Sequence, residues 1–426
     1  MEIEHKYQAI LSYLFSQFPQ YQQIGAVAYK SGLGGMEALD NLMEHPHTHF
    51  SSIHVAGTNG KGSVSHMLAA ILQQAGYRTG LYTSPHLVDF RERIRINGVM
   101  ISKEEVVRFV ARYRAYFDEL RPSFFEITTA MAFHYFAQQK VEIAVIETGL
   151  GGRLDSTNII NPILSIITNI GFDHCEFLGN TLPQIAAEKA GIMKKQTPVV
   201  IGERHPETDA LFIERAQELN VSIFFAEDDY IIDKAIQDAY LSDLKGAYQQ
   251  KNLSTVLKAA EFLPEKVTTA IIKQGLRGAA RTTGLHGRWE CISHNPRIIV
   301  DAAHNAHGLR WAVAQLHNEH YRQLHFVFGV VVEKDLCAIL PLLPKEATYY
   351  FTQAKIPRAL DAHLLAQQCR SVGPNGEVVV GVKEALERAR QNADVNDIIF
   401  VSGSIFVVAE VLEGIMDKEC LEIREK

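Results

Sequence analysis

The sequence has few of the features that mark secreted or membrane-spanning proteins. Its five cysteines are scattered and form no C-x-x-C pair, which argues against a disulfide frame or a zinc site and is typical of reduced cytoplasmic thiols. The longest apolar run, 398–412, is interrupted by polar residues and is too short to span a bilayer. Glu2 and Glu4 stand where a signal peptide would carry basic residues. We therefore expect a cytoplasmic protein with no membrane partner.

The sequence also lacks an excess of basic residues. With 42 Lys and Arg against 49 Asp and Glu, the formal net charge is -7, which argues against nucleic acid as a partner. The 47% of hydrophobic residues and 21% of charged residues are typical of a globular protein. At 426 residues the chain is too long for one typical core, so we expect two domains.

A glycine-rich stretch at 53–63, Ile-His-Val-Ala-Gly-Thr-Asn-Gly-Lys-Gly-Ser, has the clearest chemical content. The apolar run 53–56 precedes the glycines, and apolar residues recur at helical spacing after them, which predicts strand, loop and helix. Such a loop presents backbone N–H groups and a helix N-terminus to a polyphosphate. Lys61 adds a positive charge, and Ser63 offers a hydroxyl to a phosphate-bound metal ion. The common phosphate-loop motif is not matched, so an ordinary glycine-rich turn is the alternative.

Short apolar runs alternate with helical patterns along the chain, which predicts a mostly parallel α/β sheet. After a first helix at 5–18, the expected strands of the first half lie at 79–83, 143–147, 164–168 and 199–201, with helices that include 103–120 and 125–140. The pattern restarts near Gly284, with strands expected at 298–300, 324–330, 347–351, 377–380 and 398–401 and a helix at 382–391. We predict an N-terminal phosphate-loop ATPase domain at 1–285 and a smaller C-terminal Rossmann-like α/β domain at 286–426.

Polar residues follow several of these strands, at the sheet edge where ligands of α/β proteins gather. Ser63, Ser84 and Glu147 offer the oxygen ligands that Mg²⁺ prefers. An alternative pairs Glu147 with Arg153 in a salt bridge. His174 by itself is more typical of a structural histidine, because Mg²⁺ prefers oxygen to imidazole.

Other candidates are weaker when each is taken alone. Lys189 lies near the end of a helix, where a solvated lysine is favoured by the helix dipole. The segment 123–128 places two aromatics beside Glu126 and could stack against a flat heterocycle, or it is a helix start with its aromatics in the core. The polar segment 246–252 could contact a nucleotide base. Arg288 and Asp301 could reach phosphates and a strand-end ligand, although surface charges of this kind are common.

Taken together, these stretches resemble the dihydrofolate synthase/folylpolyglutamate synthase family of the Mur ligase superfamily. They follow the family's order over nearly the whole chain, and 54–63 and 147–158 are the most specific. The stretches are 54–63, 83–87, 125–126, 147–158, 173–174, 188–192, 286–288 and 301–305.

The resemblance implies an ATP-dependent ligase that joins L-glutamate to dihydropteroate, to the γ-carboxylate of a folate polyglutamate tail, or to both, through an acyl phosphate. It implies ATP contacts from Thr58, Asn59, Gly60, Lys61, Gly62, Ser63, Asn252, Arg288 and Asp301. It implies two Mg²⁺ ions held by Ser84, Glu147 and His174, catalytic roles for Lys61, Glu147, His174 and a carbamylated Lys189, and a pterin site lined by Ser123, Phe124, Phe125, Glu126, Leu154, Asp155 and Ser156.

Two other functions compete with this hypothesis. One is a ligase of the same superfamily that acts on a different carboxylate, such as a cell-wall peptide precursor. The other is a regulatory module that uses ATP as a switch. The sequence departs mildly from the family where Ala302 and Ala306 replace its usual glycine and proline. We expect small-molecule substrates and a monomer.

Overall fold

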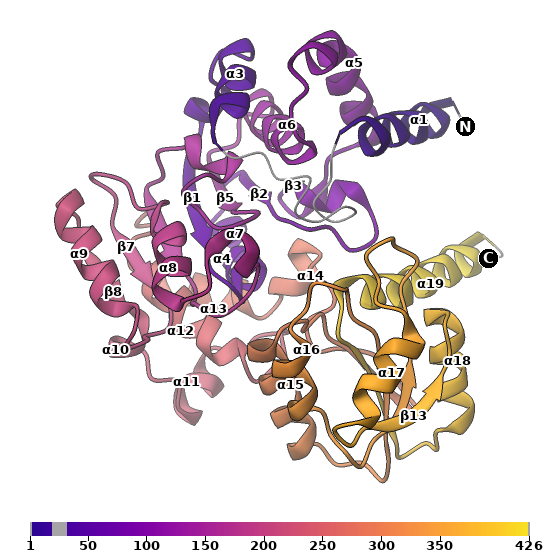
Figure 1. Cartoon of the computed structure of the whole chain (residues 1–426). Helices are drawn as coiled ribbons and strands as arrows, with labels where there is room; N and C mark the ends of the chain where they lie inside the picture. The colour runs from indigo at the N-terminus through magenta and orange to yellow at the C-terminus, as the bar shows by residue number, and fades with distance from the viewer. Residues whose placement is uncertain (1, 19–31, 425–426) are drawn as a thin grey trace. The chain divides into compact units, whose positions relative to one another are not determined.

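The computed structural model describes the backbone of residues 2–18 and 32–424 and the side chains as far as residue 415. The chain divides into two compact units (Figure 1). The first comprises Met1–Asp243 and Gln249–Leu285, and the second comprises Leu244–Tyr248 and His286–Lys426. The sequence did not indicate that Leu244–Tyr248 enters the second unit before the chain returns to the first at Gln249.

A mostly parallel sheet forms the centre of the first unit. Its strand order is β4-β3-β2-β5-β1-β6-β7-β8. All neighbouring strands from β2 to β8 run parallel, and β3 and β4 add an antiparallel edge that the sequence did not predict. The strands are β1 (Ser51–Ala56), β2 (Thr79–Tyr82), β3 (Ile94–Ile96), β4 (Val99–Met100), β5 (Ile143–Glu147), β6 (Leu164–Ile167), β7 (Val199–Ile201) and β8 (Ile223–Phe225).

Helices cover both faces of this sheet, which explains why the central strands β5 and β6 are buried at every residue. On one face α4 packs on β1, β2 and β5 and is covered by α12, α13 and α14. The opposite face carries α6 with α3 and α5, and also α8 and α9. The helices are α1 (Glu2–Gln17), α3 (Gly34–Leu42), η2 (Pro46–His49), α4 (Lys61–Gln74), η3 (Phe90–Arg93), α5 (Lys103–Leu120), α6 (Phe124–Gln138), η4 (Ser156–Ile159), α7 (Cys175–Leu178), α8 (Leu182–Ala190), α9 (Asp209–Leu219), α10 (Ala226–Asp229), α11 (Lys234–Ala239), α12 (Gln249–Ala260), α13 (Thr269–Leu276) and α14 (Ala279–Thr283).

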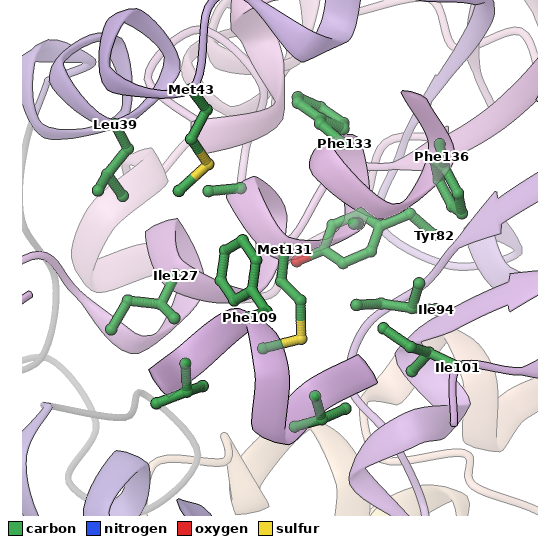
Figure 2. Packing of buried hydrophobic residues seen from close by; sticks show 14 of the residues in the cluster. Leu39, Met43, Tyr82, Ile94, Ile101, Phe109, Ile127, Met131, Phe133 and Phe136 are labelled. Carbon is green, nitrogen blue, oxygen red and sulfur yellow. The ribbon is translucent and has the colours of Figure 1, made fainter. Parts of the chain in front are cut away.

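The largest apolar cluster of the first unit lies between the sheet and the helices α3, α5 and α6. Figure 2 shows Phe133 and Phe136 of α6 near Tyr82 of β2, with Leu39 and Phe109 reaching the same cluster from α3 and α5. These side chains are at most 5% exposed. The cluster anchors the strands whose carboxyl ends carry the polar residues described below.

The second unit has a sheet of its own, in the order β13-β12-β11-β14-β10-β9. Its strands run parallel except β9, which pairs antiparallel with β10. The elements are β9 (Glu290–His294), β10 (Arg297–Val300), α15 (Ala306–Asn318), β11 (Leu324–Phe328), α16 (Leu336–Ile339), η5 (Leu340–Leu342), β12 (Thr348–Phe351), α17 (Ala362–Arg370), β13 (Asn375–Val378), α18 (Val382–Asn392), β14 (Ile398–Ser402) and α19 (Ile405–Arg424).

The predicted α/β class is confirmed, with each strand expected from the apolar runs present to within about two residues. The strand β9 was missed because its burial is only partial and its sequence, Glu-Cys-Ile-Ser-His, has little apolar content. Among the described residues, no helix is both long and apolar enough to cross a membrane. In the described part of the chain, Cys291, Cys337 and Cys369 carry free thiols.

Candidate active site

The glycine-rich stretch forms the predicted strand, loop and helix. Strand β1 ends at Ala56, and α4 begins at Lys61 with Gly60 as its N-cap. Gly60 has a φ of 83°, and a Cβ there would lie 2.3 Å from the Oδ1 atom of Asn252. The backbone therefore requires glycine for its conformation and for space. The alternative of an ordinary turn does not explain why an amide side chain is packed against it.

The loop is held in place by the end of the neighbouring strand β6. The Thr58 amide donates to the Asn169 carbonyl oxygen at 3.0 Å, and the Asn59 amide donates to the Asn169 side-chain Oδ1 at 2.9 Å. The Thr168 hydroxyl donates to the Asn59 carbonyl oxygen at 2.5 Å. These hydrogen bonds fix the conformation of the loop. The N–H groups at the N-terminus of α4 are then the groups that can bind an anion.

Two lysines lie at the same backbone carbonyl. Lys61 and Lys189 each donate to the Gly57 oxygen at 2.9 Å. Lys189 is in the last turn of α8 and is only 4% exposed. The alternative of a solvated lysine at a helix end is therefore wrong. Burial, with the nearby charge of Lys61, lowers the pKa of Lys189 from 10.5 to about 7.

The strand-end carboxylate of Glu147 lies beside the loop, because Glu147 pairs in register with Val55 of β1. Glu147 is 4% exposed and accepts a long hydrogen bond, 3.3 Å, from the Ser84 amide. Arg153 pairs with the Glu188 carboxylate at 2.8 Å, so the structure gives Arg153 a carboxylate partner other than Glu147. The buried carboxylate of Glu147 and the hydroxyl of Ser84 are oxygen donors of the kind that suits Mg²⁺.

His174 lies on the loop after β6, in a left-handed conformation with a φ of 53°. Its Nε2 atom is 4.0 Å from Asp173, and its side chain is 29% exposed. Within the ranges that the structure describes, no three His, Cys, Asp or Glu residues form a cluster that could hold a metal by themselves. A Mg²⁺ ion that arrives with phosphate needs only one or two protein carboxylates, so this finding fits such an ion.

The segment 123–126 begins α6 with a capping box. The Glu126 amide donates to the Ser123 hydroxyl at 3.1 Å, and Glu126 Oε2 accepts from the Ser123 amide at 2.5 Å. Phe124 is 4% exposed and packs in the core near Phe90. Phe125 is half-buried, and its ring lies against Gly149, where a Cβ would be 2.5 Å from Cζ. The structure thus gives the two aromatics different environments.

Asp155 organises the loop that follows Glu147. Its Oδ2 atom accepts from the amides of Gly149 and Leu150, each at 2.8 Å. Its Oδ1 atom accepts from the Thr157 amide at 3.0 Å and from the Thr157 hydroxyl at 2.5 Å. Burial raises the pKa of Asp155, and these donors oppose the rise. Leu154 and Ser156 flank it and are half-buried.

A buried histidine that the sequence analysis did not single out supports this loop from β1. His54 is fully buried, and its Nε2 atom lies 2.8 Å from the Thr157 hydroxyl. Burial lowers the pKa of His54 to about 3, so the ring is neutral near pH 7. The apolar run around His54 gave no signal of this role, because a histidine inside a strand is common in protein cores.

The start of α12 carries amides that reach the phosphate loop within the first unit. Gln249 Nε2 donates to the Ser63 hydroxyl at 3.1 Å, and Asn252 Nδ2 donates to Gln249 Oε1 at 2.7 Å. All three side chains are buried. The sequence marked the segment 246–252 as polar, but it assigned no role to Gln249.

In the second unit, Asp301 follows β10 and is 2% exposed. It accepts hydrogen bonds from the amides of Trp289 and Ala303, each at 2.8 Å. Arg288 belongs to the same turn as Trp289, and its charge acts on Asp301. Arg288 and Asp301 therefore lie close enough in the second unit to interact electrostatically.

Two Mur ligase families match the chain. The Mur ligase middle domain matches residues 55–261, and the Mur ligase glutamate ligase domain matches residues 287–405. The dihydrofolate synthase/folylpolyglutamate synthase of Bacillus subtilis is 32% identical over 90% of this chain and 94% of its own. A probable bifunctional folylpolyglutamate synthase/dihydropteroate synthase of Haloferax volcanii is 34% identical over 88% of this chain, which spans 48% of that longer relative.

Solved structures agree with these relatives. Escherichia coli FolC in complex with DHPP and ADP has a TM-score of 0.86 and 28% identity, over 97% of this chain and 98% of that one. A bifunctional folylpolyglutamate synthase/dihydrofolate synthase with Mn, AMPPNP and L-glutamate bound has a TM-score of 0.81 and 28% identity, over 96% and 98% of the two chains. The likeness therefore extends through both units.

Proposed function

The chain belongs to the dihydrofolate synthase/folylpolyglutamate synthase family and is an ATP-dependent ligase of folate metabolism, and from this premise we propose how its residues join L-glutamate to dihydropteroate, to a folate polyglutamate tail, or to both. The observation that carries the proposal is the convergence of the phosphate loop, two lysines and the strand-end Glu147 at one sheet edge. Family membership leaves a ligase for another carboxylate and an ATP-driven switch without support.

The first chemical step is transfer of the γ-phosphoryl group of ATP to the carboxylate acceptor. A carboxylate oxygen attacks the γ-phosphorus, the bond to the bridging oxygen breaks, and ADP leaves. The start of α4, from Gly60 to Ser63, offers N–H groups to the phosphates, and Lys61 places a positive charge where the transferred oxygens carry negative charge. Lys61 is held near this position by its bonds to the Gly57 and Thr58 carbonyl oxygens.

The second step forms the amide bond. The neutral amine of glutamate attacks the acyl carbon, and the tetrahedral intermediate expels phosphate. Phosphate leaves far more readily than oxide would, which is why the carboxylate must first be phosphorylated. In this proposal Asn252, Arg288 and Asp301 are the side chains that contact the nucleotide, as the resemblance to the family implies. The bound AMPPNP and L-glutamate of the related structure support both co-substrates.

Magnesium fits the donors on this edge. Ser84 and Glu147 would hold one ion, with phosphate oxygens completing its coordination. His174, whose neighbour Asp173 acts electrostatically on Lys189, would hold a second. Bound Mg²⁺ supplies charge neutralisation at the phosphoryl oxygens. The manganese in the related structure supports a divalent ion of this type.

Carbamylation of Lys189 fits the same site. A neutral amine is the form that adds to CO₂, and burial keeps a substantial fraction of Lys189 neutral near pH 7. The product is an anionic carbamate whose oxygens suit Mg²⁺ better than an ammonium group does. The hydrogen bond from Lys189 to the Gly57 carbonyl oxygen, which puts the side-chain nitrogen beside the phosphate loop, supports this proposal.

The pterin would lie near the start of α6 and the loop after Glu147. Phe125, half-buried against Gly149, offers its ring for stacking. Ser123 and Glu126 present polar atoms at the same helix start, and Phe124 supports Phe125 from the core. Leu154 and Ser156 line the other side, on the loop that Asp155 holds.

We further propose that the enzyme works as a monomer in the cytoplasm. The free thiols of Cys291, Cys337 and Cys369 are typical of a reducing compartment. Sedimentation of the purified protein would test the oligomeric state.

The decisive test is phosphate release with MgATP and glutamate, with dihydropteroate or tetrahydrofolate as the acceptor. Turnover with both acceptors would establish both reactions, and turnover with one would assign the enzyme to that reaction. A Lys61→Ala variant serves as the matched negative control. Phosphate release that does not depend on glutamate would contradict the proposal, and so would the absence of release with either acceptor.

A further inference from the structure

Tyr248 makes a partly buried hydrogen bond that the proposed function does not use. Its hydroxyl donates to Asp301 Oδ2 at 2.7 Å, within the second unit. The same oxygen accepts from the Trp289 amide, while Oδ1 accepts from the Ala303 amide. A carboxylate has about four acceptor positions, so these three donors leave about one for a ligand hydroxyl. Tyr248 is the only side chain among the three donors.

The carboxylate of Asp301 also fixes the turn that carries Arg288. Trp289, the next residue, has a φ of 49°, an unfavourable value for a large side chain, and its amide is bound to Asp301. Gly287 accepts from the Ala302 amide at 3.0 Å. The position of Arg288 therefore depends on Asp301. If the Asp301 side chain moved, both Asp301 and Arg288, the two proposed nucleotide contacts of this unit, would be displaced.

The segment that delivers Tyr248 is itself docked on the second unit. The Ala247 amide donates to Gln315 Oε1 at 2.6 Å, and Gln315 Nε2 donates to the Lys245 carbonyl oxygen at 3.2 Å. Gly246 allows the Tyr248 ring to fold back, because a Cβ at Gly246 would lie 2.6 Å from Cε1. The hydrogen bonds with Gln315 and the close packing on Gly246 thus fix the Tyr248 hydroxyl in the direction of Asp301.

We propose that Tyr248 is a positioning residue for ATP binding. Its hydroxyl holds the Asp301 side chain in the orientation that can accept a ligand hydroxyl, and through Asp301 it holds the turn that carries Arg288. This inference rests on the proposed contact of Asp301 with ATP and adds a residue for which the sequence suggested only contact with a base. Tyr248 acts through Asp301 and does not itself touch the reacting atoms.

The proposal predicts a pH dependence. Burial raises the pKa of Asp301, while the Tyr248 hydroxyl, the Arg288 charge and the two backbone amides lower it. Tyr248→Phe removes one of these stabilising donors and keeps the ring, so Asp301 should take up a proton at a higher pH. A protonated Asp301 is a poorer acceptor for a ligand hydroxyl, and ATP should then bind more weakly toward acid pH.

The experiment measures the Kd of the full-length protein for Mg-AMPPNP between pH 5.5 and pH 8. We expect Tyr248→Phe to bind about tenfold more weakly at the acid end, with the gap closing toward pH 8. In turnover assays the KM for ATP should rise while kcat changes less than about twofold. If Tyr248→Phe fails to fold, Gly246→Ala displaces the ring and should give the same acid-dependent loss.

Two further variants separate the possible outcomes. Tyr349→Phe is the matched control, because the Tyr349 hydroxyl is buried in the same unit and donates to the Pro344 carbonyl oxygen at 2.7 Å, away from Asp301. It should leave the Kd unchanged at every pH. Asp301→Asn tests the underlying contact. If Asp301→Asn binds normally, the assignment of Asp301 and the role of Tyr248 both fail. If Asp301→Asn weakens binding but Tyr248→Phe shows no loss, or an equal loss at every pH, only the role of Tyr248 is overturned.

Discussion

Lys61 and Lys189, from different helices, donate hydrogen bonds to one carbonyl oxygen, that of Gly57. Two ammonium groups at one acceptor repel each other, and Lys189 is buried as well. The protein therefore keeps a lysine where its charge is disfavoured, beside the phosphate loop. A lysine whose pKa is lowered in this way is typical of functional sites.

The pKa of Lys189, about 7 in the folded protein against 10.5 ordinarily, makes stability depend on pH. Between these values the unfolded chain binds a proton that the folded chain lacks, so stability should rise with pH by about 1.4 kcal/mol per unit. Lys189→Met should remove this rise. Below pH 7 the difference in the free energy of unfolding between the two proteins should no longer change with pH. Urea midpoints measured in CO₂-free buffer would give this difference. Parallel curves from pH 7 to pH 10 would contradict the lowered pKa.

Lys189→Ala should lose most ligase activity, because no carbamate can form there. Short carboxylates such as formate or acetate should restore part of it by occupying the space of the missing group. The exposed Lys195 provides a matched control, and Lys195→Ala should keep full activity and show no response to added carboxylates. Unchanged activity in Lys189→Ala would sink the carbamylation hypothesis.

Gly60→Ala should abolish tight ATP binding. Gly60 and Gly76 both have a φ of 83°, but a Cβ at Gly60 would meet Asn252, whereas nothing lies within 4 Å of one at Gly76. Both substitutions should lower stability by about 1–2 kcal/mol through backbone strain. Only Gly60→Ala should also weaken Mg-AMPPNP binding, by more than about tenfold, since the first turn of α4 must shift. Titration calorimetry on both variants would show whether the clash matters.

Asp155→Asn should destabilise the loop after Glu147. An asparagine can accept through only one oxygen, so its amide nitrogen would face two donors that Asp155 now binds. We expect a loss of about 1–3 kcal/mol in the free energy of unfolding and a raised KM for the pterin acceptor. Chemical denaturation and acceptor titrations would measure these two effects. A raised KM without any loss of stability would instead indicate direct contact with the acceptor.

The periodicity of the sequence was sufficient for most of the fold. Buried parallel strands read as continuous apolar runs, and β5 and β7 begin and end where those runs do. The edge strands β4 and β9 were not predicted because edge strands bury less surface: β4 has only two residues, and β9 is only partly buried and carries polar residues. Local pattern also says nothing about long-range docking, which is why the inclusion of Leu244–Tyr248 in the second unit was not foreseen.

For the site, the amino-acid sequence by itself determined the glycine-rich loop, the strand-end Glu147 and the family, since these depend on residue types at fixed spacing. Only the tertiary structure decided that Lys189 is buried against Gly57, that Arg153 pairs with Glu188, and that Tyr248 holds Asp301. Each of these contacts joins residues far apart in the chain. Their burial and electrostatic environment arise only when separate strands and helices pack together, so neither could be read from local spacing.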